Sequence, residues 1–156
     1  MYKVNVVCVG KLKESFYFLA QEEYKKRISK FCELNIVELS ENALDEKASE
    51  SAIEKSLEKE AIKIEPHLKG FVWVCDSFGR QYDSVEFSKK LISNLDEKGT
   101  VTFVIGSSYG LSKKFKERYE KISFSKLTFP HHLIRVFLLE QVFRAFTIKN
   151  NITYHK

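Results

Sequence analysis

The 156-residue chain is poor in the residues that mark collagen-like and low-complexity proteins, since it contains only six glycines and two prolines. No uncharged apolar run approaches the roughly 18 residues needed to span a bilayer, and the amino terminus lacks the apolar core of a secretory signal. Hydrophobic residues make up 44% and charged residues 30% of the chain, so we expect one globular domain over residues 1–156. We also expect a cytoplasmic location and no membrane partner.

Cysteine is too scarce to form a metal or redox motif. Cys8, Cys32 and Cys75 are widely spaced, and none belongs to a C-x-x-C pair or stands beside a histidine at metal-ligand spacing. We therefore interpret all three as reduced packing residues and predict no bound metal. The chain also lacks G-x-G-x-x-G, Walker and G-x-S-x-G motifs, which removes the motif support for dinucleotide, nucleoside triphosphate and hydrolase sites.

Apolar residues alternate between strand-like and helix-like spacing along the whole chain. Short apolar runs rich in β-branched residues predict strands at 3–9, 34–39, 71–75, 100–105 and 122–129. Apolar spacing of three to four residues predicts helices at 13–31, 42–65, 83–98, 112–121 and 131–150. This repeated alternation predicts an α/β fold with a parallel sheet covered on both faces.

Charges of the two signs are unevenly distributed. Residues 113–156 hold 10 lysines and arginines against 3 acidic residues, whereas residues 1–112 hold 16 against 18. A basic surface of this kind suits a polyanion, of which nucleic acid is the most common in a cell. A merely solubilising surface is the alternative explanation.

Three segments that follow predicted strands carry residues suited to a ligand site. They are 75–80, which has the composition of a turn, 106–110 and 127–132. Ligands of parallel α/β sheets lie outside the carboxyl ends of the strands, and glycine lets the backbone approach a ligand closely. Alone, a G-x-x-x-G loop such as 106–110 is more simply explained by turn chemistry. His131 and His132 open a helix, where capping or packing is the simpler explanation than catalysis.

Taken together, in this order and spacing, the three segments resemble the RlmH family of the SPOUT methyltransferase superfamily. The resemblance covers all 156 residues. The residues that carry it are Val6-Val7-Cys8-Val9-Gly10-Lys11, Asp76-x-x-Gly79-Arg80, Ile105-Gly106, Gly110-Leu111-Ser112, Phe129-Pro130-His131-x-Leu133-x-Arg135-Val136, Glu140-Gln141-Val142-Phe143-Arg144-Ala145 and Tyr154-His155-Lys156.

The resemblance implies a parallel-sheet SPOUT fold whose carboxy-terminal segment is threaded through a loop as a trefoil knot, and a homodimer packed through the last helix. It implies an S-adenosylmethionine-dependent enzyme that methylates N3 of pseudouridine 1915 in helix 69 of 23S rRNA, on the assembled ribosome. The residues that it implies for cofactor binding are Cys75, Asp76, Gly79, Gly106, Ser107, Gly110, Ser125, Lys126, Leu127, Thr128, Phe129 and Pro130.

For such a reaction, we hypothesise that the carboxy-terminal residues act on the RNA. Tyr154 and His155 would reach the base, with His155 as general base because its reference pKa of about 6.5 suits neutral pH; considered alone, His155 belongs to a frayed tail. Arg135 and Arg144 would steady phosphate or the negative charge that develops on the uracil oxygens. The residues expected to bind RNA are Lys113, Lys114, Lys116, Arg144 and Lys156, helped by Lys121 and Lys126.

The chain departs from the family pattern at two positions. Members commonly have Gly-Gly where this chain has Gly106-Ser107, and an acidic or amide residue where it has Tyr109. If residue 107 must adopt a left-handed conformation, serine there would cost about 1–2 kcal/mol, or roughly tenfold in cofactor affinity. The alternative function is a non-catalytic ribosome- or RNA-binding module with a weakened cofactor pocket.

Overall fold

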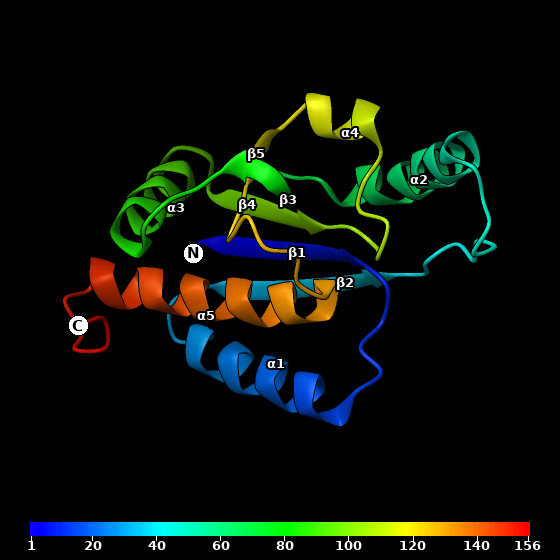
Figure 1. The fold of residues 1–156 in the computed structure, drawn as a ribbon. Helices are drawn as coiled ribbons and strands as arrows, with labels where there is room; N and C mark the ends of the chain where they lie inside the picture. Colours follow the sequence, from blue (N-terminus) through cyan, green and yellow to red (C-terminus); the bar gives the residue numbers. More distant parts are fainter.

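The computed structural model describes residues 1–156 and contains a five-stranded sheet with helices on both faces (Figure 1). The order across the sheet is β2-β1-β4-β3-β5, and every pairing between strands is parallel. The strands are β1 (Lys3–Val9), β2 (Glu33–Leu39), β3 (Phe71–Arg80), β4 (Thr100–Ile105) and β5 (Glu120–Ile122). The predicted α/β class with a parallel sheet is confirmed.

The helices divide between the two faces of the sheet. They are α1 (Ser15–Ile28), α2 (Glu50–Ile64), the 3-10 turn η1 (Glu65–His67), α3 (Ser84–Lys98), α4 (Lys113–Glu117) and α5 (His131–Lys149). On one face, α5 lies between α1 and α3; α2 and α4 cover the other face (Figure 1). No helix combines the length and the apolar character that crossing a membrane requires.

Each face of the sheet contributes to its own apolar core, because successive residues of a strand point to opposite sides. In β1, Val4 and Val6 belong to the core under α1, α3 and α5, whereas Val7 and Val9 belong to the core under α2 and α4. The broad apolar surface predicted for the last helix is explained in part by its position, since α5 contacts both neighbouring helices. The sheet and α5 therefore fix where the loops at the strand ends come together.

The helix ends next to β4 are capped by residues typical of such positions. Asp83 and Glu86 form a capping box at the start of α3, and Gly99 ends that helix in a left-handed conformation with φ of 73°. The hydroxyl of Ser112 accepts a hydrogen bond of 3.1 Å from the backbone N–H of Phe115 at the start of α4. These caps fix the helix ends on either side of β4.

Three predicted helices are longer than the observed ones. The helix predicted at 42–65 begins only at Glu50, where the hydroxyl of Ser49 accepts from the N–H of Ala52 at 3.2 Å and so caps the first turn. The helix predicted at 112–121 ends at Glu117, because the chain turns there to enter β5. The helix predicted at 13–31 is α1, two to three residues shorter at each end.

The predictions for β3 and β5 are wrong in their extent. The strand predicted at 122–129 is β5, Glu120–Ile122, and the expected turn at 76–80 lies inside β3. Cys75 and Arg80 both pair with Ile122, so the intervening residues bulge out of the sheet. Because β3 ends at Arg80, opposite Ile122, no residue of β3 remains to pair with the chain after Ile122. Residues 123–130 therefore form a loop.

Candidate active site

The three predicted segments meet at the carboxyl edge of the sheet, where they enclose a pocket of about 650 Å³. We call it the loop pocket; it is formed by residues 75–78, 105–110 and most of 122–131, with Lys116 and Ile134. Ten of the twelve residues predicted to bind the cofactor line it. They are Cys75, Asp76, Gly106, Ser107, Gly110, Ser125, Leu127, Thr128, Phe129 and Pro130.

Gly79 and Lys126, the other two predicted cofactor residues, do not line the loop pocket. Gly79 lies in the β3 bulge, where an added Cβ would stand 2.7 Å from backbone atoms of Ile122. In this position, the glycine allows β3 to pack closely against β5. Lys126 is exposed in the loop before α5, and its side chain is outside the pocket.

The loop after β4 is a tight turn that depends on glycine. A Cβ on Gly106 would lie 2.5 Å from the carbonyl carbon of Gly110, too close for any real contact. The turn closes through a 2.8 Å hydrogen bond from the N–H of Gly110 to the carbonyl of Ser107. Only Gly110 of these residues has a positive φ, of 83°, so Ser107 carries none of the left-handed strain considered above. Its hydroxyl is buried and faces the carboxyl of Glu60.

The loop before α5 is held by its own hydrogen bonds. The hydroxyl of Ser123 donates to the carbonyl of Ser125 at 2.9 Å, and the N–H of Leu127 donates to the hydroxyl of Ser125 at 3.0 Å. The N–H of Ser123 donates to the carbonyl of Arg80 at 2.9 Å, which ties the loop to the end of β3. Backbone groups of this loop therefore face the pocket from a fixed position.

Several lining residues were not predicted as site residues. Phe124 belongs to the misassigned strand. His131 is the first residue of α5, and Ile134 lies about one turn into it, so helical spacing from Pro130 could have found Ile134. The Nε2 atom of His131 is buried without a partner. Burial lowers the pKa of His131, and the neighbouring His132 lowers it further, so the imidazole is neutral at physiological pH.

Arg135, predicted to act on RNA, is buried within the protein with its side chain 1% exposed. It donates to Glu38 at 2.6 Å, to the side-chain carbonyl of Gln21 at 3.1 Å and to the backbone carbonyl of Gly10 at 3.1 Å. Within the chain, Arg135 joins α5 to α1, to β2 and to the end of β1, and so positions the helix that opens at Pro130.

Tyr154 and His155 fold back onto α5. The hydroxyl of Tyr154 donates to Glu140 at 3.1 Å, and its ring lies 4.7 Å from the guanidinium carbon of Arg144. Arg144 donates to Glu140 at 2.6 Å and contacts Nδ1 of His155 at 3.1 Å. Burial raises the pKa of Tyr154, and the charge of Glu140 raises it further, so the phenol keeps its proton.

The contact with Arg144 determines which nitrogen of His155 carries the proton. A guanidinium has only donors, so Nδ1 must be the acceptor in this contact. Neutral His155 then carries its hydrogen on Nε2. In this arrangement Nδ1, the nitrogen of His155 that could accept a proton, already accepts a hydrogen bond from Arg144.

The tail and the loop pocket are separate within one chain. Figure 1 shows the carboxy terminus near the far end of α5 from Pro130. Glu140, which holds Tyr154, lies ten residues along the helix from Pro130, roughly 15 Å at 1.5 Å per residue. His155 instead lines a second cavity of about 880 Å³ between α3 and α5, which adjoins the loop pocket at Ile122 and Phe124. One chain therefore does not bring its predicted catalytic residues to its predicted cofactor site.

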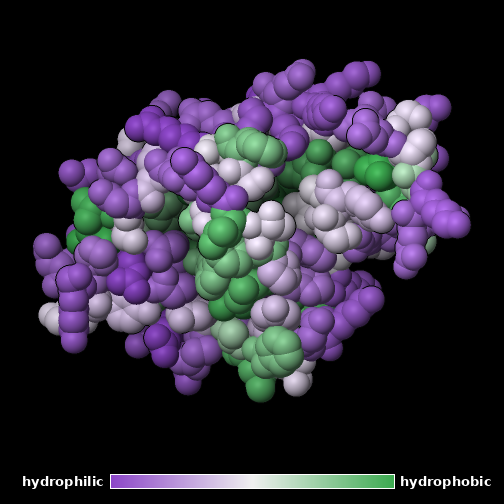
Figure 2. All heavy atoms as spheres, viewed as in Figure 1, coloured by the Kyte–Doolittle hydropathy of each residue, from purple (hydrophilic) through white to green (hydrophobic).

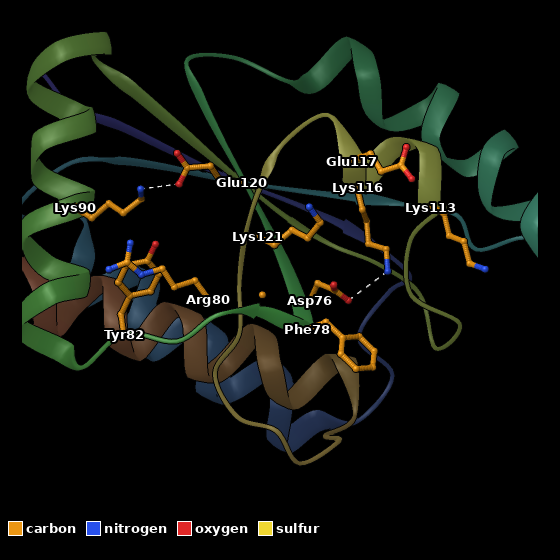
Figure 3. A pocket seen from close by; sticks show the side chains of 11 residues that line it. Asp76, Phe78, Arg80, Tyr82, Lys90, Lys113, Lys116, Glu117, Glu120 and Lys121 are labelled. Atoms are coloured by element: carbon orange, nitrogen blue, oxygen red, sulfur yellow. Dashed lines mark hydrogen bonds and ion pairs between the residues drawn. The ribbon is translucent and has the colours of Figure 1, made fainter.

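The predicted RNA-binding residues fall into two groups. Lys113 and Lys116 line a groove beside the loop pocket (Figure 3), and Lys114 is 84% exposed nearby on the same short helix. Arg144 and Lys156 belong instead to the carboxy-terminal group around Glu140. Lys116 also reaches Asp76 at 3.4 Å, at the boundary between groove and pocket.

Comparison with known proteins agrees with this geometry. A family model described as "Predicted SPOUT methyltransferase" matches residues 2–155. The chain is 41% identical over 156 residues to the ribosomal RNA large subunit methyltransferase H of Malacoplasma penetrans, with 99% of both chains covered. It is 46% identical over 162 residues to the protein of the same name from Clostridium novyi, with 98% of this chain and 99% of the relative covered. Loops, sheet order and sequence together place the chain in the SPOUT methyltransferase superfamily, as a member of the ribosomal RNA large subunit methyltransferase H (RlmH) family.

Proposed function

We propose that this protein transfers a methyl group from S-adenosylmethionine to N3 of pseudouridine 1915 in helix 69 of 23S rRNA, with the assembled ribosome as substrate. We further propose that residues 1–156 act as a single methyltransferase domain. The observation that carries the proposal is the loop pocket, which three segments build at the carboxyl edge of the sheet, next to a basic groove. The substrate class comes from the relatives, whose names describe large-subunit rRNA methyltransferases.

The residues of the loop pocket fit the cofactor. Its volume of about 650 Å³ lies within the range of small-molecule sites, roughly 300–1000 Å³. Gly106 and Gly110 line it without side chains, so a ligand can approach the backbone of this turn closely. When bound, S-adenosylmethionine supplies an electrophilic methyl group on a sulfonium sulfur. Backbone groups of 106–110 and 125–130 would hold it.

The path of the chain after β5 supports the trefoil knot that we propose. From β5 at the edge of the sheet, residues 123–130 pass beside the loop after β4 and line the same pocket. The chain then enters α5, which lies in the middle of the helical layer (Figure 1). Threading of this kind is a rare exception to the usual unknotted connections.

The proton on N3 of the target base must be removed for methyl transfer, and we assign this step to His155. N3 lies on the Watson–Crick edge, so the base must be unpaired or turned out of its stack. His155 cannot accept the proton while Arg144 occupies Nδ1. We propose that an RNA phosphate draws Arg144 away, since Arg binds phosphate through paired N–H donors. Nδ1 of His155 is then free to take the N3 proton.

A homodimer would reunite the two separated parts of the site. The tail of one chain lies roughly 15 Å along α5 from the loop pocket of the same chain, so a second copy is the simplest source of a tail beside that pocket. Figure 2 shows apolar side chains gathered in a band across the middle of one face, toward α1. On α1, Phe16 and Leu19 are 62% and 67% exposed. Exposed apolar surface of this kind is typical of a protein interface.

The proposal is tested on ribosomes from cells that lack this protein. Incubation with the purified chain and S-adenosylmethionine is expected to add one methyl group to the pseudouridine, as measured by mass spectrometry of rRNA digests. Calorimetry with the same cofactor is the companion measurement. No heat at millimolar ligand would establish the non-catalytic RNA-binding alternative, and a methyl group on another nucleotide would overturn the assigned target.

Replacement of Gly106 by alanine tests the pocket itself. The new Cβ would meet the carbonyl group of Gly110, and the forced displacement should cost about 1–3 kcal/mol, a roughly 5- to 150-fold loss of S-adenosylmethionine affinity. The matched control is Ser107→Gly. Because Ser107 has no positive φ, this variant should bind within about threefold of the original protein. Equal affinity of Gly106→Ala and the original protein would contradict the assignment of the turn to the cofactor.

A further inference from the structure

A second hollow, which we call the basic groove, opens beside the loop pocket. It has a volume of about 740 Å³ and lies between the β3 bulge, α3, α4 and β5 (Figure 3). Asp76, Phe78 and Lys116 line both hollows. A chain-like ligand lying in the basic groove would therefore reach the loop pocket directly.

Three of the five cations in the basic groove have no acidic partner. Lys90 pairs with Glu120 at 2.6 Å, and Lys116 pairs with Asp76 at 3.4 Å. The remaining cations have no carboxylate within 4.0 Å of their charged groups; they are Arg80, Lys113 and Lys121. These three cations outnumber Glu117, the one lining carboxylate without a cation partner, and an excess of positive charge is suited to the phosphates of a polyanion.

Phe78 stands at the rim that the two hollows share. The pairing of both Cys75 and Arg80 with Ile122 pushes residues 76–79 out of the sheet, and the side chain of Phe78 is 92% exposed as a result. At the other end of the bulge, Gly79 packs directly against the backbone of β5. The pairing of the two strands therefore fixes the backbone position from which Phe78 projects. The ring is thus held next to Asp76 with its faces open (Figure 3).

Aromatic rings beside a basic groove are the usual arrangement for binding single-stranded nucleic acid, because bases stack on the ring while phosphates follow the charges. We propose that an unpaired base of the RNA, adjacent to the target nucleotide, stacks on Phe78 while its flanking phosphates contact Arg80, Lys113 and Lys121. This inference rests on the proposed function and names the contact that guides RNA to the loop pocket. The guanidinium carbon of Arg80 lies 4.8 Å from the ring centre of Tyr82. This contact reduces the conformational freedom of the Arg80 side chain before RNA binds.

The test uses two fluorescein-labelled 12-nucleotide RNAs, oligouridine and an abasic strand with the same number of phosphates. Phe78→Ala should weaken binding of oligouridine about tenfold in fluorescence polarisation and leave binding of the abasic strand unchanged. Phe78→Trp should restore binding and add tryptophan fluorescence that oligouridine quenches, since the chain's only tryptophan, Trp73, is fully buried. Phe78→Leu keeps apolar area without an aromatic face and should not restore binding. Equal losses on both strands, or no loss, would overturn stacking.

The charged part of the proposal has a separate readout. Arg80→Ala and Lys121→Ala should weaken binding of both strands and should each lower the slope of log affinity against log salt by about 0.7. Lys30→Ala, an exposed lysine outside the basic groove, is the control and should leave the slope unchanged. An unchanged slope in the two groove variants would contradict phosphate contact.

The outcome is distinguishable from failure of the proposed function. If the protein methylates ribosomes but Phe78→Ala binds oligouridine normally, the stacking contact is wrong and the function stands. If no methyl group is transferred, but Phe78→Ala weakens binding of oligouridine and not of the abasic RNA, the proposed function is wrong and the RNA contact stands. A changed sedimentation coefficient of Phe78→Ala with unchanged RNA affinity would assign the ring to a contact between two copies and overturn the proposal.

Discussion

Removal of Tyr154, His155 and Lys156 is expected to reduce methyl transfer to ribosomes by about 100-fold or more, the usual contribution of a positioned acid or base. Binding of S-adenosylmethionine should stay within about twofold of the original, because none of the three residues lines the loop pocket. Single-turnover transfer of a labelled methyl group and calorimetry measure the two quantities. Unchanged transfer would remove the tail from the mechanism.

Substitutions of His155 separate proton transfer from hydrogen bonding. Glutamine keeps an N–H donor but cannot accept a proton near neutral pH, so His155→Gln should be as slow as His155→Ala if the imidazole acts as general base. Tyr154→Phe keeps the ring beside Arg144 and removes only the hydrogen bond to Glu140, so it measures the contribution of the phenol separately from that of His155. An active glutamine variant would show that His155 donates a hydrogen bond and that another group takes the proton.

Glu38→Ala is expected to lower the free energy of unfolding by about 3–5 kcal/mol, because it leaves the charge of Arg135 buried with neutral partners only. Glu33→Ala on the same strand is the matched control. Glu33 pairs with Lys3 at 3.9 Å, and both side chains are about half exposed, so its loss should cost at most about 1 kcal/mol. Urea unfolding at one fixed protein concentration measures both. Similar losses for the two variants would contradict the role given to Arg135.

The ion pair between Glu38 and Arg135 also predicts a loss of stability in acid. Burial alone would raise the pKa of Glu38, but the hydrogen bond from Arg135, together with the N–H of Leu12 and nearby positive charges, lowers it below 4.5. The folded protein therefore keeps Glu38 ionised at a pH where the unfolded chain binds a proton. The stabilisation is complete above about pH 4.5 and is lost as the pH falls through the folded pKa. The difference in the free energy of unfolding between the original protein and Glu38→Gln, measured by urea unfolding at several pH values, should become smaller below pH 4.5.

Local patterns predicted the elements of the fold, because each depends on residues close together in the chain. The capping box of Asp83 and Glu86 and the stop at Gly99 are read from neighbouring residues. The end of β5 is different, since it depends on the double pairing of Ile122 with Cys75 and Arg80. Alternating apolar residues continue to Phe129, yet no strand is available to pair with them. Sequence periodicity contains no information about that missing neighbour.

The loop pocket was predictable because the carboxyl ends of parallel strands meet at one edge. The role of Arg135 was not, since its partner Glu38 lies 97 residues away on β2. An arginine on an apolar helix can be a buried structural ion or a ligand for phosphate. Which of the two it is depends on whether a carboxylate from another part of the chain pairs with it. Phe78 was missed for a related reason: a phenylalanine is expected to be buried, and the bulge that exposes it arises from the pairing of β3 with β5.

The central strand pair also constrains how the newly made chain folds. β1 pairs with β4, so residues about 97 positions apart must meet before the middle of the sheet exists. Such distant pairings are slow to form. During synthesis, β1 can find β2, but its other edge stays open until β4 has left the ribosome, and the part of one sheet face between α1 and α3 remains uncovered until α5 follows. A nascent chain halted before residue 131 would therefore present an open sheet to chaperones and to aggregation.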